Sequence, residues 1–276
     1  MKALGKKDDR RRRRETVVSI CLFVTLLLLA PFLAPYDSIQ VDPVNRLLPM
    51  NGSHLLGTDH LGRDLLSRLL EGAQTTVGVS FLIMLIVLLI GIPIGLLSGF
   101  AGGIIDRFFM RMTDAFMAFP DFIVAIVLSG LLGPGLMNLI IAIATVKWTS
   151  YARLVRSTVI NEKEKTYIIV AELNGVSKFR IMTKHLLPYV IGHVMVLGTL
   201  DIGKVILMIA SLSYIGLGAQ PPSPEWGAML NDGRAYFHTA PHLMVVPGLA
   251  IVFVVLISNL LGDRLRDSYD VKIGGS

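Results

Sequence analysis

The chain has 276 residues, of which 53% are hydrophobic, with a formal net charge of +6 and a mean hydropathy of +0.64. This apolar share exceeds that of ordinary soluble domains, so the composition predicts an all-α integral membrane protein without a separate soluble domain. Its single cysteine, Cys21, excludes a disulfide framework and a cysteine-rich metal site within one chain.

The chain begins with a basic tail, Met1–Glu15, followed by the apolar run Val17–Ala34. A charged start before an apolar run is also typical of a signal peptide. However, the run of 18 residues is close to the ~20 that span a bilayer, and Pro31 and Pro35 lie where a cleavage site would be. We therefore predict a retained first transmembrane helix, and we attribute the adjacent arginines Arg10–Arg14 to binding of anionic lipid rather than nucleic acid.

Five further apolar runs predict five more transmembrane helices, which gives six in all. The predicted spans are Thr75–Leu97, Phe108–Leu132, Leu136–Val155, Tyr189–Leu217 and His242–Leu261. Pro120 should kink the third span, because a proline removes a backbone hydrogen bond. Glycines at four-residue spacing predict that another helix packs closely on the second span. These glycines are Gly91, Gly95, Gly99 and Gly103.

The positive charges are distributed unequally between the two faces that six spans define. Twenty of the 26 Lys and Arg residues lie in the tail, the turn after the second span, the loop after the fourth span and the C-terminus, whereas four lie in the opposite segments. The positive-inside rule therefore predicts that both termini and the central loop are cytoplasmic. Residues 1–72 would hold the tail, the first transmembrane helix and an external segment. Residues 73–276 would hold a five-helix core with a polar loop at 156–188 and a cytoplasmic C-terminal tail.

The stretch Tyr167–Pro188 is a polar, basic island between two apolar runs. Gly175 separates two short helical patterns, because a residue without Cβ permits a tight turn. Pro188 can open the following helix, since a proline in the first turn loses no backbone hydrogen bond. The pattern predicts a helix–glycine–helix hook, which would either lie flat on the bilayer or dock into a cytoplasmic partner.

This hook resembles the EAA signature of permease subunits in binding-protein-dependent ABC importers. The residues that match the signature are Ala171, Gly175, Leu187 and Pro188. Ile169 and Val170 stand where the family usually has Glu and its first Ala, so the resemblance carries over the hook but not a salt bridge from that Glu. It implies that the residues coupling to an ATPase are Ala171, Glu172, Asn174, Gly175, Phe179, Leu187 and Pro188.

Three other segments extend the resemblance over roughly residues 30–270. LLGTDHLGRDLLSRL at 55–69, GLGAQPPSPEWGAML at 216–230 and NLLGDRLRD at 259–267 resemble, in this order, segments of the dipeptide/oligopeptide/nickel branch of these permeases. WTSYARLVRS at 148–157, TLDIG at 199–203 and PEWGAMLNDGR at 224–234 are most similar to the nickel-type permeases.

The resemblance implies a type I ABC importer permease fold in which the loop 156–188 carries a cytoplasmic coupling helix. It implies a non-catalytic subunit of the bacterial cytoplasmic membrane that forms half of the translocation pathway for nickel or a related metal chelate. A di- or oligopeptide importer is an alternative, and a stand-alone secondary transporter is another. The implied partners are a second permease subunit in a heterodimer, two cytoplasmic ATPase subunits that bind ATP and Mg, and an external substrate-binding protein.

Other motifs favour structural roles over chemistry. The run Gly198–Lys204 matches most of a phosphate-binding loop, but Val205 follows it where Ser or Thr is needed, and it lies in an apolar helix. We therefore predict no nucleotide or other cofactor on this chain. His238 and His242 are four residues apart, but the intervening Pro241 argues against a shared metal, so we predict no metal site.

The external turn around residues 59–68 concentrates charge, which we interpret as helix capping and ion pairing because no activated nucleophile accompanies it. Asp59 would cap the helix that follows, and Asp64 would pair with Arg68 four residues later. His60 and Arg63 belong to the same turn.

Charged residues within predicted spans are candidates for the translocation pathway, because such residues normally face a bundle interior or a water-filled route. Asp201 and Lys204 are three residues apart, so a purely structural ion pair is the alternative for them. Asp114 and Asp121, close to Pro120, raise the same question.

Overall fold

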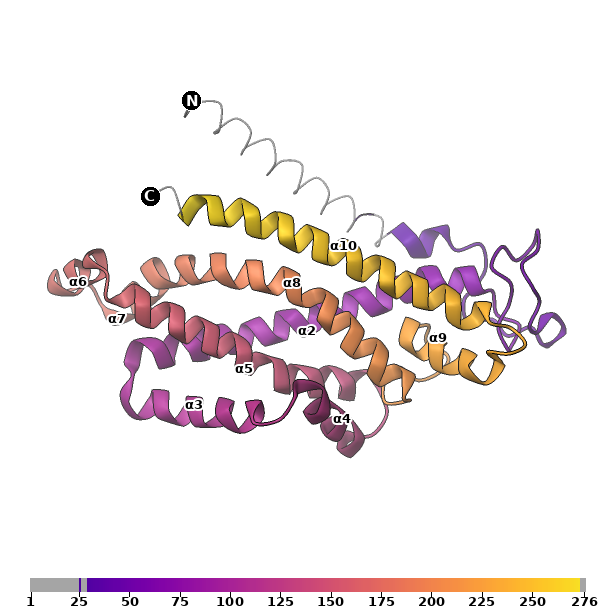
Figure 1. Cartoon of the computed structure of the whole chain (residues 1–276), viewed down its shortest axis with the longest axis horizontal. Coiled ribbons are helices and arrows are strands. Elements are labelled where there is room, and N and C mark those ends of the chain that lie inside the picture. The colour runs from indigo at the N-terminus through magenta and orange to yellow at the C-terminus, as the bar shows by residue number, and fades with distance from the viewer. Residues whose placement is uncertain (1–24, 26–28, 274–276) are drawn as a thin grey trace, which may run out of the picture. The chain divides into compact units, whose positions relative to one another are not determined.

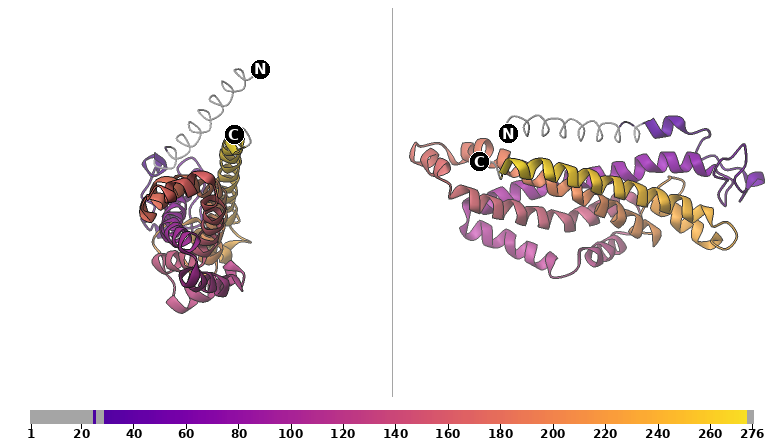
Figure 2. Two further views of the ribbon diagram at one scale, coloured as in Figure 1. Left: turned by 90° about the vertical axis from the view of Figure 1, so that its left-hand side faces the viewer. Right: turned by 45° about the horizontal axis from the view of Figure 1, so that its top comes forward.

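The computed structural model describes residues 25 and 29–273, and the ordered elements in this part of the chain are helices. They can be followed in Figure 1 and from two further sides in Figure 2. The chain divides into two compact units. Unit 1 contains the described residues up to Phe81, together with Ser129–Ile140 and the described residues from Thr199. Unit 2 contains Leu82–Leu128 and Ile141–Gly198.

The helices follow one another with short connections. The α-helices are α2 (Leu65–Ala101), α3 (Gly103–Met117), α4 (Asp121–Leu132), α5 (Leu136–Lys163), α6 (Thr166–Leu173), α7 (Lys178–Ile181), α8 (Leu187–Tyr214), α9 (Trp226–Gly233) and α10 (His242–Ile273). Three 3-10 helices, η1, η2 and η4, cover Ala30–Leu33, Pro43–Asn45 and Arg234–Tyr236, and the π-helix η3 covers Met182–Leu186.

Three of the described helices are long and apolar enough to cross a membrane, namely Leu65–Ala101, Lys178–Tyr214 and His242–Arg264. The third predicted span is not one straight helix, because the chain bends by 88° between α3 and α4, and the two together count as a fourth candidate. This break lies at Pro120, so the predicted kink is confirmed and is sharper than expected. Most of the predicted first span lies outside the described residues, and the count of six stays a prediction.

The fourth predicted span corresponds to α5, which does not meet the same criterion of length and hydropathy. Polar and charged side chains, among them Asn138, Lys147 and Arg153, interrupt its apolar sequence. Many of its other side chains are nevertheless fully buried, including Leu139, Tyr151 and Val159. The helix is therefore buried against protein along much of its length.

The N-terminus of α2 lies ten residues before the predicted start of the second span, because Asp64 caps it. Asp64 Oδ2 accepts hydrogen bonds from Ser67 N and Ser67 Oγ, each at 2.8 Å. A side-chain acceptor at this position satisfies a free N–H of the first turn. The charged turn at residues 59–68 thus begins α2, which is long and apolar enough to cross a membrane.

The core of unit 1 is an apolar cluster where the first part of α2 meets α8, α9 and α10. It includes Leu65, Val77, Ile206, Trp226 and Leu243, all at most 3% exposed. The Trp226 indole donates from Nε1 to Leu69 O at 2.9 Å, so its one polar atom is satisfied inside the cluster. This packing fixes α9 against the start of α2.

In unit 2, α2 and α5 pack so closely that glycine is required on α2. A Cβ at Gly95 would lie 2.6 Å from Ala152 O and 2.6 Å from Val155 Cβ. Gly91 and Gly99 are equally tight, at 2.8 Å from the nearest α5 side-chain atoms. The close helix contact predicted from the four-residue spacing is confirmed for these three glycines. Gly103 has no neighbour within 4 Å and takes no part.

Candidate functional site

The hook between α5 and α8 turns at Gly175, as the sequence predicts. Gly175 has φ of +74°, a left-handed conformation that favours glycine. Its N–H donates to Glu172 O at 2.9 Å, and Val176 N donates to Ala171 O at 3.1 Å, which together end α6 as a Schellman motif. Ser177 then caps α7, since its Oγ accepts from Arg180 N at 3.4 Å. Figure 1 shows α6 and α7 beyond the ends of α5 and α8 that they connect.

Buried side chains anchor the hook to the rest of unit 2. Ile168, Ile181 and Leu186 are completely buried. At the junction with α5, Tyr167 Oη donates to Glu162 Oε1 at 2.6 Å, and Lys165 Nζ lies 3.1 Å from Glu162 Oε2. Burial and the hydrogen bond with Glu162 raise the pKa of the Tyr167 hydroxyl above its usual range. These contacts hold the first turn of α6 on the end of α5.

Apolar side chains project from the anchored hook. Leu173 is 82% exposed and Phe179 is 75% exposed. Leu173 was not among the predicted coupling residues. Of those besides Phe179, Ala171 and Leu187 are half-buried, and the exposed ones are Glu172, Asn174, Gly175 and Pro188. The hook therefore combines an anchored base with an outer surface on which exposed apolar side chains stand among polar and charged ones.

Pro188 lies in the first turn of α8, but the helix does not begin there. The chain continues from α7 through the π-helix into α8, and Leu187 N donates to Met182 O, five residues back. A π-turn accommodates the proline, which cannot donate to the preceding turn. The hook is thus continuous with α8, whereas the sequence alone suggested a fresh start at Pro188.

The predicted pathway residues Asp114 and Asp121 form ion pairs with α5. Asp114 Oδ1 lies 2.6 Å from Arg153 Nη2, and Asp121 Oδ2 lies 2.9 Å from Lys147 Nζ. The side chains of the first pair are 60% and 43% exposed. The Lys147 side chain is 11% exposed and that of Asp121 is 45% exposed, so the lysine is the more buried partner of the second pair.

A third ion pair, which sequence reasoning missed, joins Asp106 of α3 to Arg156 of α5. Its second contact runs from Arg156 Nη2 to Asp106 Oδ2 at 2.6 Å, so the pair is bidentate. The acids at 106, 114 and 121 pair with bases at 156, 153 and 147, so the residue numbers rise along α3 and α4 as they fall along α5. This opposite order is expected of chain segments that run antiparallel. The sequence offered one signal for these ion pairs, namely three acids in or beside one predicted span and three bases in or beside the next. Figures 1 and 2 show α3 beside α5.

The other two pathway candidates, Asp201 and Lys204 of α8, pair with each other. Lys204 Nζ donates to Asp201 Oδ1 at 2.8 Å, which is the ion pair that their three-residue spacing predicted. The Asp201 side chain is 8% exposed, whereas that of Lys204 is 66% exposed. This pair belongs to unit 1, while Asp114 and Asp121 belong to unit 2.

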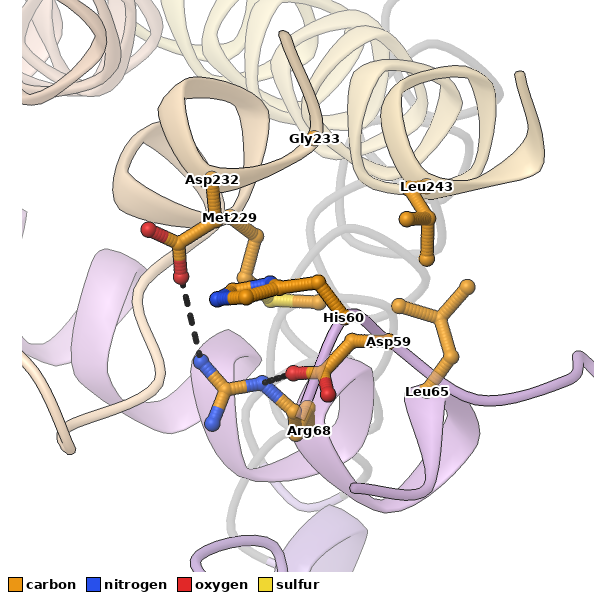
Figure 3. A pocket seen from close by; sticks show the side chains of 8 residues that line it. All are labelled: Asp59, His60, Leu65, Arg68, Met229, Asp232, Gly233 and Leu243. Atoms are coloured by element: carbon orange, nitrogen blue, oxygen red, sulfur yellow. Dashed lines mark ion pairs between the residues drawn. The ribbon is translucent and has the colours of Figure 1, made fainter. Parts of the chain in front are cut away.

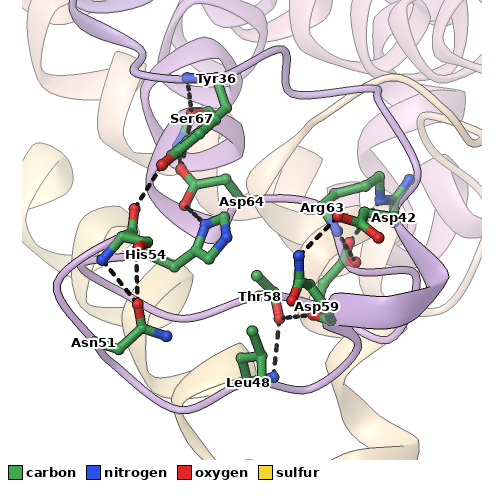
Figure 4. Close-up of polar contacts among 12 residues, drawn as sticks. Tyr36, Asp42, Leu48, Asn51, His54, Thr58, Asp59, Arg63, Asp64 and Ser67 are labelled. Atoms are coloured by element: carbon green, nitrogen blue, oxygen red, sulfur yellow. Dashed lines mark hydrogen bonds and ion pairs between the residues drawn. The ribbon is translucent and has the colours of Figure 1, made fainter.

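The charged turn at residues 59–68 of unit 1 has a structural role, although one predicted pair is wrong. Asp64 caps α2 and lies 2.9 Å from His54 Nδ1, so its carboxylate does not pair with Arg68 (Figure 4). Asp59 instead accepts from Arg63 Nε at 2.6 Å and lies 3.5 Å from Arg68 Nε. Asp59 also accepts from the N–H of Arg63 and so caps the turn before α2 rather than α2 itself.

The same turn is tied to α9. Arg63 and Arg68 reach Asp232 of α9 at 3.6 and 3.9 Å. Beside them, a cavity of about 10 Å³ lies between Asp59, His60, Arg68 and Asp232 (Figure 3). A cavity of this size holds at most about one water. The paired charges and the small cavity support a structural junction rather than a substrate site.

A buried glutamate makes a second link between α2 and the start of α9, and sequence reasoning missed it. Glu225 caps α9 by accepting from Gly227 N and Ala228 N, both at 2.9 Å. Thr76 Oγ1 of α2 donates to Glu225 Oε1 at 3.1 Å. Complete burial raises the pKa of the Glu225 carboxyl. The only signal for this cap in the sequence was a glutamate directly before Trp226 and Gly227.

Comparisons with known proteins agree with these features. Residues 91–274 match the family described as binding-protein-dependent transport system inner membrane component. The chain is 42% identical to the nickel transport system permease protein NikC of Escherichia coli, over 93% of each chain. It is 40% identical to the glutathione transport system permease protein GsiD of Pectobacterium atrosepticum, over 95% of this chain and 88% of the relative. For the dipeptide transport system permease protein DppC of Alkalihalophilus pseudofirmus, the identity is 39%, over 93% and 84%.

A solved structure shows a similar fold. The inward-facing MetNI methionine ABC transporter matches 72% of this chain and 95% of its own chain, with a TM-score of 0.57 and 21% identity. The family match covers more than half of the chain, and the relatives cover nearly all of it. The chain therefore belongs to the family of binding-protein-dependent transport system inner membrane components, and it is a permease component of an ABC importer, a transport subunit rather than an enzyme.

Proposed function

We propose that this chain pairs with a second, similar permease and forms half of a pathway that imports nickel in a small chelate. As a permease of this family it works with an ATPase and a binding protein. Two ATPase subunits in the cytoplasm bind ATP and Mg, and the binding protein delivers cargo from outside. The 42% identity to a nickel permease supports this cargo. Both chain termini lie in the cytoplasm, as the distribution of Lys and Arg predicts.

The hook is the proposed contact with the ATPase, and its geometry is the observation that carries the proposal. Leu173 is 82% exposed on a segment whose base is fixed by buried side chains. An exposed apolar side chain on a rigid helical turn suits a groove on a partner protein. A loop that only lay on the bilayer would not need the Schellman turn at Gly175 to keep the Leu173 side chain exposed.

The same geometry allows the hook to act as a lever. Its C-terminal end continues without a break into α8, and its N-terminal end is fixed to α5 through Glu162. α5 in turn packs on the glycines of α2 and pairs with α3 and α4. A push on the hook by the closing ATPase would therefore move these helices together as a rigid body.

We further propose that the exposed ion pairs line the pathway. Asp114, Arg153 and Lys204 are charged and between 43% and 66% exposed on helices of a membrane protein, and the buried Asp201 pairs with Lys204. Charged groups in such helices normally face a water-filled route or a protein interior. Their pairing keeps the pathway close to neutral, which suits passage of a chelate that carries little net charge.

The lever role is tested with hook variants in the assembled transporter. Gly175→Val should abolish cargo-stimulated ATP hydrolysis, because a β-branched residue is strained at a φ of +74°. Leu173→Ala should weaken the stimulation while preserving membrane insertion. Leu131→Ala, on an equally exposed leucine of α4, is the matched control and should leave stimulation unchanged. Normal stimulation in the Gly175 variant would exclude the lever.

The cargo is tested by uptake in cells that lack the gene. Restored uptake of radiolabelled nickel, without restored dipeptide uptake, is expected when the gene is returned. The reverse result would favour a di- or oligopeptide importer, which the similarity to the dipeptide and glutathione permeases makes the second candidate. Transport by the reconstituted chain alone, driven by an ion gradient, would instead identify a secondary transporter.

A further inference from the structure

A groove in unit 2 lies beside the hook, and two of the predicted coupling residues, Phe179 and Leu187, are among the residues that line it. It has a volume of about 550 Å³ and lies between α2 and the segment from α7 to the start of α8. The α2 wall is one helix face, whose apolar side chains recur every three or four residues from Leu85 to Leu97. The opposite wall is formed by Phe179, Met182, Thr183 and Leu187.

The lining of this groove is hydrocarbon. Thr183 carries the only polar group among the lining side chains, and its Oγ1 already donates to Phe179 O at 2.9 Å. On the α2 wall, Leu85 and Leu89 are 54% and 64% exposed. A metal chelate or a peptide would find no side chain here to bind its polar atoms. An alkyl chain would bury the exposed leucines without leaving a polar group unsatisfied.

The length of the groove matches one leaflet of a membrane. Leu85 and Leu97 are twelve residues apart on α2, which corresponds to about 18 Å at a rise of 1.5 Å per residue. The hydrocarbon core of a bilayer is about 30 Å thick, so each leaflet contributes about 15 Å. A groove of this length accommodates one acyl chain from the headgroup level to the middle of the bilayer.

Positive charge gathers at the hook end of the groove. Lys178, Arg180 and Lys184 alternate in sequence with the groove residues Phe179, Met182 and Thr183, and all three cations are exposed. None of them forms an ion pair with another described residue. Basic side chains beside a pocket on the cytoplasmic side of a membrane protein attract anionic lipid headgroups.

We propose that the groove binds one anionic phospholipid of the cytoplasmic leaflet. Its acyl chain lies along Leu85–Leu97, and its phosphate is held by Lys178, Arg180 and Lys184. The bound lipid bridges α2 and the base of the hook. The proposal depends on the cytoplasmic location of the hook but not on the cargo or on the ATPase contact.

Lipid retention by the full-length chain tests the proposal. Native mass spectrometry of the purified chain with phosphatidylglycerol or phosphatidylcholine should show one tightly retained phosphatidylglycerol. Removing all three cations (Lys178→Gln, Arg180→Gln, Lys184→Gln) should weaken its binding about 100-fold, or about fivefold per cation. Leu89→Trp, which narrows the groove, should weaken retention of both lipids.

Matched controls separate the groove from general attraction to a membrane. Arg107→Gln with Arg111→Gln removes two exposed cations of α3, and Leu131→Trp enlarges an exposed leucine of α4. Both should leave retention unchanged. Equal retention by the charge-removed chain and by this arginine control, or equal retention of the two lipids by the wild-type chain, would overturn the proposal.

The other candidate occupant is the apolar run of the same chain that contains Cys21. A cysteine introduced at Thr183 allows this to be tested, because Cys21 is the only native cysteine. Lipid occupancy predicts no cross-link between the two positions within one chain. An efficient intramolecular cross-link would show that the N-terminal run covers the groove and would refute lipid binding there.

Discussion

Replacement of Gly95 by alanine tests whether α2 and α5 pack as closely as described. The new Cβ would lie 2.6 Å from Ala152 O and 2.6 Å from Val155 Cβ. Since one of these atoms belongs to the backbone, the helices must separate. Overpacking of a well-packed contact costs about 1–3 kcal/mol. Alanine also gains about 1 kcal/mol of helix propensity over glycine, which conceals part of this loss.

A second glycine of α2 removes that ambiguity. Gly78 lies in the same helix, and a Cβ there meets nothing within 4 Å. Gly78→Ala should gain the helix propensity without the clash, so the difference between the two variants equals the overpacking, about 1–3 kcal/mol. The free energy of unfolding in mixed detergent micelles measures it. If Gly95→Ala were as stable as Gly78→Ala, the close contact of α2 with α5 would be refuted.

Three further predictions concern charged residues. Asp59→Ala leaves buried Arg63 without its closest partner and should destabilise the protein by about 3–5 kcal/mol. Asp64→Ala removes the cap of α2 and should cost about 0.5–2 kcal/mol. Equal losses of unfolding free energy in the two variants would contradict these roles. Burial raises the pKa of the Glu225 carboxyl, so the wild-type protein loses stability as the pH increases from 4.5, the usual pKa of a glutamate, to the raised pKa. Glu225→Gln should therefore reduce the dependence of stability on pH. A stability difference between wild type and Gln variant that did not change over this range would disprove the effect of burial. Exchanging Asp114 and Arg153 should preserve transport that either single charge reversal reduces, and an inactive double variant in uptake assays would show that the pair does more than balance charge.

Local rules of chain geometry made part of this protein predictable. The turn at Gly175 follows from the freedom of glycine at positive φ, and the tight face of α2 follows from small residues at four-residue spacing. Each of these two predictions depends only on residues that are close together in the sequence. The break near Pro120 was also predictable in position, but its angle of 88° depends on how α4 packs and not on the proline alone.

Partners distant in sequence were not predictable from spacing. Asp64 and Arg68 have the spacing of a helical ion pair, yet Asp64 satisfies the free N–H groups at the start of α2, and Arg68 turns to Asp59 and Asp232. The link from Thr76 to Glu225 joins residues far apart in the chain. Such contacts depend on tertiary packing, for which one sequence gives no direct signal.

The location of the hook is the central claim, and the accessibility of Leu173 tests it most directly. A Leu173→Cys variant in which Cys21 is replaced by Ser carries a single thiol on the hook. A membrane-impermeant maleimide should label this thiol in inverted membrane vesicles that lack the ATPase subunits but not in intact cells. Adding the ATPase subunits to the vesicles should protect the thiol from labelling. Labelling from outside intact cells, or labelling that the ATPase leaves unchanged, would contradict the account.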